Sequence, residues 1–238
     1  MMLTHRGLRN WVWRFERRFP VWWILAVSLV AWALLVFPQT ADVHVRHGRA
    51  GALTGLEVGH HIVMAVATML PFAIGPATFA CRTSLWCRRY RAGGLVVFGF
   101  FMIAAPAHVV LAAAARFADE IPHALVLGVA AALTCAWAIS PYRRARVRRC
   151  GRTASLAPNG SRADTDCVRY GLSQGLACVV ACWAFMAVGA LAPHDARILV
   201  SIFALQLLAR APRAADTARA ISSITLERAL QRYSLTLT

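Results

Sequence analysis

The chain has 238 residues, of which 59% are hydrophobic, and its formal net charge is +16. A soluble domain is usually about 45–50% apolar, so the composition argues against an ordinary soluble globular protein. All 26 basic residues are arginine, and a positive charge of this size is compatible with either nucleic acid or an anionic membrane surface as a partner.

The apolar residues are concentrated in six blocks, a pattern that is typical of membrane-spanning segments. A span needs about 20 residues to cross roughly 30 Å of hydrocarbon. The sixth block is short and reaches this length only if residues 211–215 join it and Arg210 and Arg213 extend toward the interface. We predict an all-α, polytopic membrane helix bundle with six transmembrane helices, at about 21–37, 62–80, 93–115, 124–139, 171–192 and 198–209.

The arginines are distributed unequally between the two sides of this predicted bundle. Twenty-two of the 26 lie in the two tails and in the second-to-third and fourth-to-fifth connections, whereas the ten acidic residues divide equally. Because arginine-rich loops are cytoplasmic, we expect both termini in the cytoplasm and the protein in the cytoplasmic (inner) membrane of a bacterium. Anionic headgroups of the lipid bilayer then suffice as partners of the charge, and nucleic acid is not expected to bind.

We expect one membrane domain, residues 21–209, between a basic cytoplasmic tail of residues 1–20 and a second cytoplasmic tail of residues 210–238. A basic start before an apolar run resembles a signal peptide, but no small-x-small cleavage site follows, which favours an uncleaved first span. The second tail suits an interfacial amphipathic helix or, equally, a frayed solvated helix. The longest polar connection covers residues 142–170, and its middle, GRTASLAPNGSRADTD (residues 151–166), is rich in turn formers and is predicted to be mobile.

Sulfur recurs every four residues in the fifth block, at Cys178, Cys182 and Met186. On a helix this spacing places all three side chains on one stripe. Thiolate and thioether ligands favour soft metals such as Cu(I). Cysteine and methionine also suit close helix packing, so both interpretations remain open. The CxxxC spacing argues against a redox pair, because the two side chains converge poorly for a disulfide.

Two more sulfur residues lie in other segments. Met69 precedes Pro71 in the second block, where the helix must kink and leave a carbonyl without its helical partner. Cys150 lies in the arginine-rich inner connection, where neighbouring positive charge favours a thiolate. We predict that Met69 completes a metal site across the bundle and that Cys150 accepts or releases the metal on the inner side.

Most of the histidines fall on the outer side of the predicted bundle. His44, His47, His60 and His61 suggest an outer capture site for a metal ion, although loop histidines are also commonly solvated. His108 differs because it lies inside the third predicted span, where an ionisable residue suggests either function or structural pairing across the bundle.

The segment GLSQG, at residues 171–175, matches the G-x-S-x-G pattern of serine hydrolases. That pattern needs a preceding strand, whereas here a charged connection precedes an apolar helix. We therefore interpret Gly171 and Gly175 as a GxxxG pair, one helical turn apart, that lets a neighbouring helix approach.

Two regions resemble a bacterial family of integral membrane proteins described as predicted metal-binding proteins, some of whose members are labelled copper chaperones. The fifth span of that family reads approximately H-G-x-x-C-x-G-C-C-W-x-L-M. The matching residues in this chain are Gly175, Cys178, Cys182, Trp183 and Met186. The family turn after the fourth span is matched by Pro141, Arg143 and Cys150, and its M-x-x-A-M-M-x-P segment by Met64, Ala67, Met69 and Pro71.

The chain also departs from the family pattern. Four positions carry other residues than the family pattern. Gln174 replaces the family histidine, Val180 replaces its second glycine, Ala181 replaces the first of its adjacent cysteines, and Arg146 replaces a loop cysteine. Residues 205–213 contain no counterpart of an acidic residue near the end of the sixth span. Several family ligands are therefore replaced, while the sulfur stripe remains.

From the residues and the resemblance together we predict a membrane-embedded copper-binding protein that handles Cu(I) or delivers it to another membrane or periplasmic metalloprotein, without catalytic turnover. Cys178, Cys182, Met186 and Met69 are the predicted ligands. The alternative is a non-catalytic membrane scaffold or assembly subunit, in which the sulfur stripe is only packing and the GxxxG pair joins a partner helix. A permease is less favoured, because few ionisable residues lie inside the spans.

Overall fold

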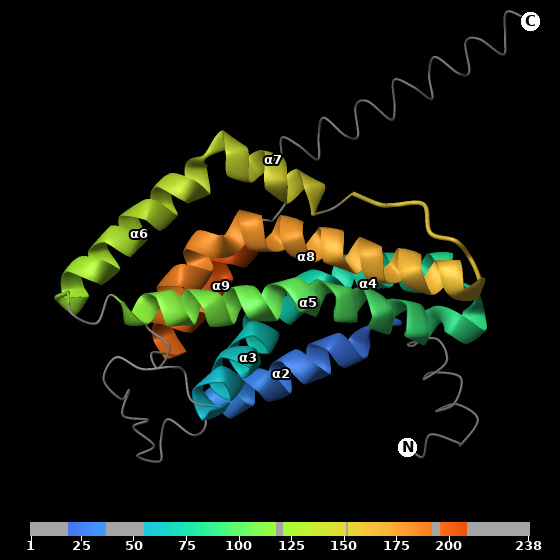
Figure 1. The fold of residues 1–238 in the computed structure, drawn as a ribbon, viewed down its shortest axis with the longest axis horizontal. Helices are drawn as coiled ribbons and strands as arrows, with labels where there is room; N and C mark the ends of the chain where they lie inside the picture. Colours follow the sequence, from blue (N-terminus) through green and yellow to red (C-terminus); the bar gives the residue numbers. More distant parts are fainter. Residues whose placement is uncertain (1–18, 37–54, 118–120, 151, 192–195, 209–238) are drawn as a thin grey trace, which may run out of the picture. The chain divides into compact units, whose positions relative to one another are not determined.

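A computed structural model of the chain describes residues 19–36, 55–117, 121–150, 152–191 and 196–208. Within these ranges the protein is all-α and contains no strand, as the sequence predicts. The helices are α2 (Trp22–Val36), α3 (Gly55–Met69), η2 (Leu70–Ala73), α4 (Ile74–Thr83), η3 (Trp86–Arg88), α5 (Arg89–Arg116), α6 (His123–Ile139), α7 (Pro141–Arg149), α8 (Gly160–Leu191) and α9 (Ala196–Leu208) (Figure 1).

A helix lies at each of the six predicted apolar blocks, but their lengths differ. Three helical runs are long and apolar enough to cross a membrane: Gly55–Thr83, Trp86–Arg116 and Gly160–Leu191. A fourth is added if α6 and α7, which meet at an angle of 68°, count as one bent span. Helices α2 and α9 are apolar but shorter. The helical bundle is thus confirmed, with three or four segments of spanning length among the described residues, and the number of six spans stays a prediction.

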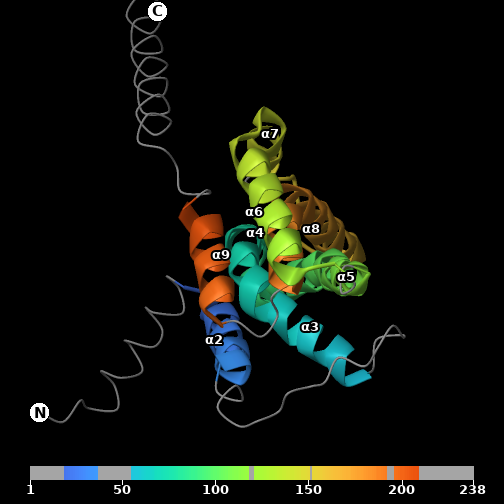
Figure 2. The same cartoon turned by 90° about the vertical axis from the view of Figure 1, so that its left-hand side faces the viewer.

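The packing of α5 against α8 organises the bundle. The two helices lie side by side and run in the same direction (Figures 1 and 2). A Cβ atom on Gly171 would collide with the carbonyl oxygen of Val96, and one on Gly175 would lie 2.7 Å from the carbonyl oxygen of Phe100. Gly99 of α5 makes the reciprocal approach to the backbone of α8. The predicted role of the GxxxG pair is therefore confirmed, and its partner helix belongs to the same chain.

Pro71 interrupts the second helical run, as predicted. The backbone changes from α-helix to the 3-10 segment η2 at Leu70 and returns to α-helix at Ile74. Proline cannot donate a helical hydrogen bond and crowds the preceding turn, which accounts for the change at this position. The interruption lies beside α5 and α8 and carries Met69 at its start, fully buried.

The arginine-rich connection after the fourth block contains more helix than the prediction gave it. Residues 152–159 are not helical, whereas residues 141–149 form α7 and residues 160–170 are the first turns of α8. Ser140 begins α7 as its N-cap and accepts a hydrogen bond from the backbone N–H of Tyr142, while Pro141 occupies the first helical position. Serine at the N-cap and proline at N1 both favour a helix start. The chain therefore turns at Ser140 and runs back along α8.

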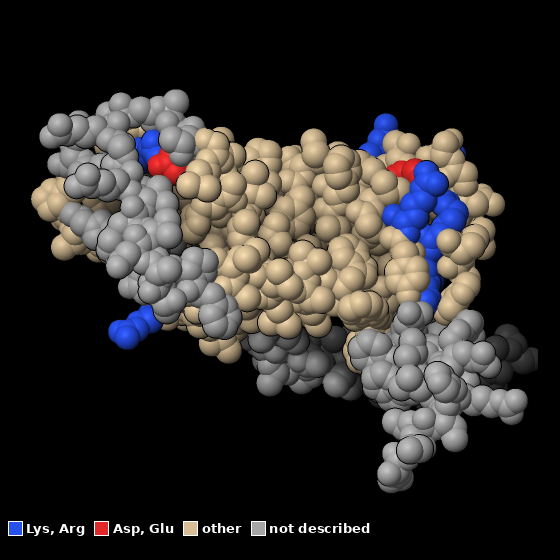
Figure 3. Space-filling view, turned by 90° about the horizontal axis from the view of Figure 1, so that it is seen from below, with Lys and Arg blue, Asp and Glu red and all other residues tan. Residues whose placement is uncertain are grey.

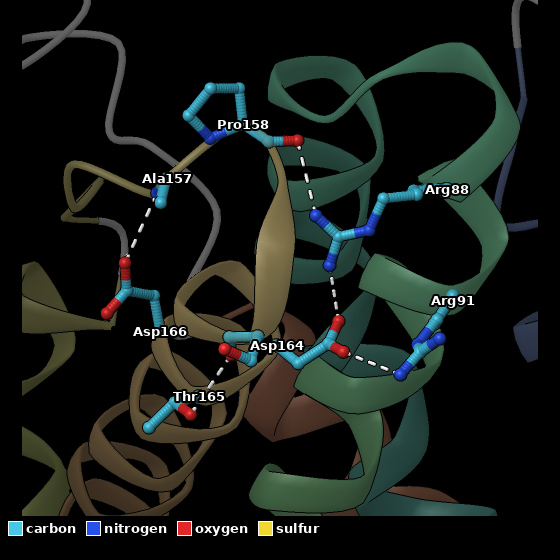
Figure 4. Close-up of polar contacts among 8 residues, drawn as sticks. Arg88, Arg91, Ala157, Pro158, Asp164, Thr165 and Asp166 are labelled. Carbon is cyan, nitrogen blue, oxygen red and sulfur yellow. Dashed lines mark hydrogen bonds and ion pairs between the residues drawn. The ribbon is translucent and has the colours of Figure 1, made fainter.

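An ion-pair cluster joins the starts of α5 and α8. Arg88 and Arg91 both bind the carboxylate of Asp164, and Arg91 Nη2 lies 2.6 Å from Asp164 Oδ2 (Figure 4). Arg88 also donates to the carbonyl oxygen of Pro158 at 3.3 Å. Exposed ion pairs contribute little stability individually, but this set fixes the two helix starts at one level.

Charged side chains lie at the ends of the long helices. Arg116, at the end of α5, pairs with Glu57 of α3, while the Arg88–Asp164 pair lies at the start of α5. On the face shown in Figure 3, the described charged residues occupy two separated regions, and the described surface between them carries none. An uncharged surface between charged ends is typical of helices that face hydrocarbon.

Replacing Gly171 with alanine should destabilise the bundle, because the new methyl group would meet backbone atoms of α5 that cannot move aside independently. Overpacking of this kind costs about 1–3 kcal/mol, and we expect a lower thermal midpoint in detergent. Gly94→Ala is the matched control, since a Cβ at Gly94 has no neighbour within 4 Å and alanine favours helix by about 1 kcal/mol. Equal midpoints for the two variants would contradict the proposed role of Gly171.

Candidate metal centre

The predicted sulfur stripe of α8 faces the interior of the bundle. Cys178, Cys182 and Met186 are 1%, 0% and 2% exposed. They belong to one buried cluster that also contains Met69, Phe100 and Ala104, and the cluster is therefore built from three helical runs that are far apart in the sequence. The other buried members of the cluster, Ala73, Phe100, Ala104 and Ala181, have hydrocarbon side chains, so sulfur supplies the donor atoms of the cluster.

Met69 and Cys178 bring sulfur atoms from two different helices together. The Sγ atom of Cys178 lies 4.0 Å from the Sδ atom of Met69. With metal–sulfur bonds of about 2.3 Å, two sulfur ligands of one ion lie roughly 3.8–4.0 Å apart in tetrahedral or trigonal geometry. This pair therefore has the separation that a shared soft metal ion requires. Cys182 and Met186 follow on the same face of α8, one and two turns further along.

Cys150 also approaches the cluster, although the sequence places it in an inner loop. It follows α7 as its C-cap, and its backbone N–H donates to the carbonyl oxygens of Arg146 and Val147. The half-buried Cys150 and Val147 pack against the buried cluster. The loop assignment of Cys150 is corrected, since α7 carries this residue back along α8. All five predicted sulfur residues thus belong to or border one cluster, and metal binding by them remains a prediction.

A buried arginine, for which the sequence patterns predict no role in a site, lies beside this cluster. Arg143 of α7 is 2% exposed, and its Nε atom donates to the carbonyl oxygen of Ala181 at 3.1 Å. The guanidinium carbon lies 5.2 Å from the ring centroid of Phe185. A full positive charge is thus held on the turn of α8 that contains Cys182. Its sequence signal is its position two residues after Pro141, in the first turn of a helix that returns the chain to α8.

Helix α6 is held to the same turn of α8. Trp137 donates from its indole nitrogen to the carbonyl oxygen of Ala181 at 3.1 Å, and Thr134 donates to the carbonyl oxygen of Ala184 at 3.2 Å. The Trp137 ring also packs edge-on against Trp183, with a centroid separation of 5.5 Å. These contacts therefore hold the corner between α6 and α7 against the turn of α8 that contains Cys182.

The predicted outer capture site is only partly described. His44 and His47 lie outside the described residues. His60 and His61 belong to α3, with ring centroids 5.7 Å apart and edge-to-face. Across the described ranges, no three His, Cys, Asp or Glu side chains are grouped so that they could hold a metal ion. The pair His60–His61 is thus placed together, while the four-histidine site stays a prediction.

His108 of α5 is 1% exposed and lies close enough to His61 of α3 for the two rings to interact electrostatically. Its Nδ1 atom has no hydrogen-bond partner among the described residues. Structural pairing of His108 across the bundle stays a prediction. Neither ring belongs to the sulfur cluster.

Comparison with known proteins identifies one family. The sequence model of PpoB2, described as a copper chaperone, matches residues 58–227, which is well over half of the chain and includes α3 to α9 almost completely. No curated protein matches the chain. No solved structure matches it either.

The burial of the cluster predicts selective protection of its cysteines. In detergent, a maleimide should modify Cys87, which is exposed in the connection before α5, long before Cys178 and Cys182, which are buried. Peptide mass spectrometry after timed labelling measures the rates, and denatured protein provides the control in which all seven cysteines react. Labelling of Cys178 and Cys182 at the rate of Cys87 in folded protein would mean that the stripe does not face the interior.

Proposed function

Because the chain belongs to the PpoB2 copper chaperone family, we propose that it is a membrane-embedded protein that binds a soft metal ion, Cu(I) above others, and delivers it to another membrane or periplasmic metalloprotein. The ligands are Cys178, Cys182, Met186 and Met69. No catalytic turnover is part of this proposal, since the side chains of the cluster are metal donors without an accompanying acid or base.

The observation that carries the proposal is the convergence of sulfur from α8 and from the Pro71 break. Cys178 and Met69 have sulfur atoms 4.0 Å apart in a fully buried cluster. Two thiolates and two thioethers form a donor set that prefers Cu(I) to the harder divalent ions. Packing alone explains the burial of these residues, but it does not require sulfur at every position of the stripe.

Charge balance supports the same assignment. Cu(I) with two thiolates carries a net charge of −1, which is costly in a medium of low dielectric constant. The buried guanidinium of Arg143 is held one residue from Cys182 by its hydrogen bond to Ala181. With Arg143 the loaded site is neutral. This pairing also gives a reason for a buried arginine at a position where the helix pattern alone offers none.

A route for the ion follows from the order of the sulfur atoms. Cys150 borders the cluster at the arginine-rich end of α7, and in this proposal it passes copper between the cytoplasmic side and Cys178. The outer histidines His44, His47, His60 and His61 would capture or release the ion at the opposite surface. Transfer between thiolates needs no change in oxidation state, so no redox partner is required.

The proposed location is the cytoplasmic membrane of a bacterium, with six spans and both termini inside. The unequal distribution of arginine between loops supports this orientation. The three helices of spanning length and the uncharged band in Figure 3 support membrane embedding. In a six-span arrangement α2 and α9 are the short members, and α6 with α7 forms the bent one.

The alternative of a scaffold subunit loses one of its arguments. That alternative assigns the GxxxG pair to a partner helix, whereas Gly171 and Gly175 pack against α5 of the same chain. The copper experiment below also separates the two functions, because a scaffold would not retain Cu(I) at the sulfur stripe.

We expect purified protein that has been loaded anaerobically with Cu(I) and washed to retain copper, and the Cys178→Ser/Cys182→Ser variant to lose most of it. Cys87→Ser/Cys135→Ser is the matched control, since it removes two exposed cysteines outside the cluster. Elemental analysis by mass spectrometry gives the copper content of each sample. Equal copper in the wild type and the Cys178/Cys182 variant would remove the proposed site.

Neutralising Arg143 should weaken Cu(I) binding, because the loaded site would then keep its negative charge. At an effective dielectric constant of about 20, two unit charges roughly 10 Å apart interact by about 1.7 kcal/mol. We therefore expect Arg143→Gln to raise the Kd for Cu(I) by about tenfold, measured by competition with a chromogenic chelator.

Two variants control for structural effects of that change. Arg144→Gln removes an exposed charge from the same helix and should leave the Kd unchanged. Arg143→Lys keeps the charge and should recover much of the affinity, although lysine cannot reproduce the guanidinium geometry. Equal affinities for Arg143→Gln and Arg143→Lys would show that the charge of this residue does not act on the metal.

A further inference from the structure

A cavity of about 410 Å³ opens where the end of α7 meets α8, outside the sulfur cluster. Three arginines line it: Arg146, Arg149 and Arg152. The polar residues of its α8 wall are Tyr170, Ser173 and Gln174, and the apolar residues beside them are Leu176 and Ala177. None of its lining residues is acidic, and among the described residues these three arginines form no ion pair. The cavity is therefore suited to an anion.

Gln174 indicates what else the ligand must carry. This residue is 5% exposed, and its Nε2 atom donates to the carbonyl oxygen of Arg152 at 3.1 Å. Tyr170 donates to the same carbonyl at 3.2 Å. The Oε1 atom of Gln174 has no hydrogen-bond partner among the described residues. Since the amide orientation is fixed by the Nε2 bond, a buried acceptor remains, and a ligand with a hydroxyl or ammonium donor would satisfy it.

An apolar element adjoins this polar wall. Leu176 is 56% exposed and, with Ala177, continues the cavity along α8. Guanidinium groups bind phosphate through paired N–H donors, and basic pockets on the cytoplasmic side of membrane proteins bind lipid headgroups. The three features together describe an amphiphile: a phosphate, a nearby hydrogen-bond donor and the start of an acyl chain.

We infer that this cavity, the α7–α8 cavity, is a binding site for a phosphodiester headgroup that carries a hydroxyl or ammonium donor, as in an anionic glycerophospholipid. The arginines hold the phosphate and Gln174 accepts from the donor. The inference that the headgroup belongs to a lipid rests on the membrane placement proposed above. The inference about the headgroup chemistry does not rest on that placement, and neither inference depends on copper binding.

Binding is tested with two forms of one headgroup. Purified protein is mixed with phosphatidylcholine vesicles containing a minor fraction of phosphatidylglycerol, and separately with water-soluble glycerophosphoglycerol. Native mass spectrometry after vesicle extraction measures retained lipid, and calorimetry measures the soluble form. Arg149→Gln/Arg152→Gln removes two charges from the α7–α8 cavity, while the matched control Arg144→Gln/Arg148→Gln removes two from exposed positions of α7 outside it.

We expect the cavity variant to lose at least tenfold in binding and the control variant to lose less than threefold. Retention of the lipid alone identifies a membrane source, and binding of both forms identifies the headgroup itself as the determinant. Either result supports the site. Equal losses in the two variants, or binding of neither form by the wild type, would overturn it.

A second comparison tests the role of Gln174. Phosphatidylmethanol carries the same charge as phosphatidylglycerol but no headgroup hydroxyl, so the wild type should bind it several-fold more weakly. The Gln174→Leu variant should bind the two lipids equally, and its binding should still increase with the fraction of anionic lipid in the vesicles. Equal binding of the two lipids by the wild type would contradict the assignment of Oε1 as an acceptor for the ligand. Because copper binding is measured separately on the same samples, failure here leaves the metal proposal standing, and the reverse also holds.

Discussion

Gly99, Gly171 and Gly175 let the backbones of α5 and α8 touch, and the placement of the candidate metal centre depends on this contact. A side chain at any of these positions would separate the two helices by the width of a methyl group or more. With the helices in contact, the face of α8 that carries the glycines continues directly into the stripe of Cys178 and Cys182. The same packing therefore sets the distance of the sulfur atoms from Phe100 and from the Pro71 break.

Several buried and half-buried polar side chains of the bundle donate to backbone carbonyl oxygens of neighbouring helices. Ala181 accepts from both Trp137 and Arg143, and Ser28 of α2 donates to Ala67 of α3 at 3.0 Å. In a medium without water each buried donor needs such a partner. At Ala181 this requirement has a further consequence, because satisfying the guanidinium of Arg143 also places its charge beside Cys182. One interaction thus joins the fold of α6 and α7 to the electrostatics of the sulfur cluster.

The features that could be predicted from the sequence are those set by local periodicity. The four-residue spacing of sulfur placed Cys178 and Cys182 on one face, proline predicted the interruption at Pro71, and the GxxxG pair predicted a close helix approach. These patterns depend on neighbours within one or two turns.

The features that were missed depend on contacts distant in sequence. Arg143 was counted only among the arginines of the fourth-to-fifth connection and in the family turn, because its hydrogen-bond partner, Ala181, lies 38 residues away. The return of α7 along α8 placed Cys150 at the cluster for the same reason. The six spans were predicted from apolar composition, and three or four segments of spanning length are found among the described residues. Composition does not show that Ser140 and Pro141 divide the fourth block from a second helix.

The central claim is that sulfur atoms from α8 and from the Pro71 break bind one copper ion. X-ray absorption at the copper edge, on protein loaded with Cu(I) and containing selenomethionine, tests this directly, because selenium is distinguishable from sulfur as a neighbour of copper. The account predicts a shell of sulfur together with selenium from Met69 and Met186 at bonding distance. A shell of nitrogen or oxygen without selenium would place copper elsewhere and would leave the sulfur stripe as packing.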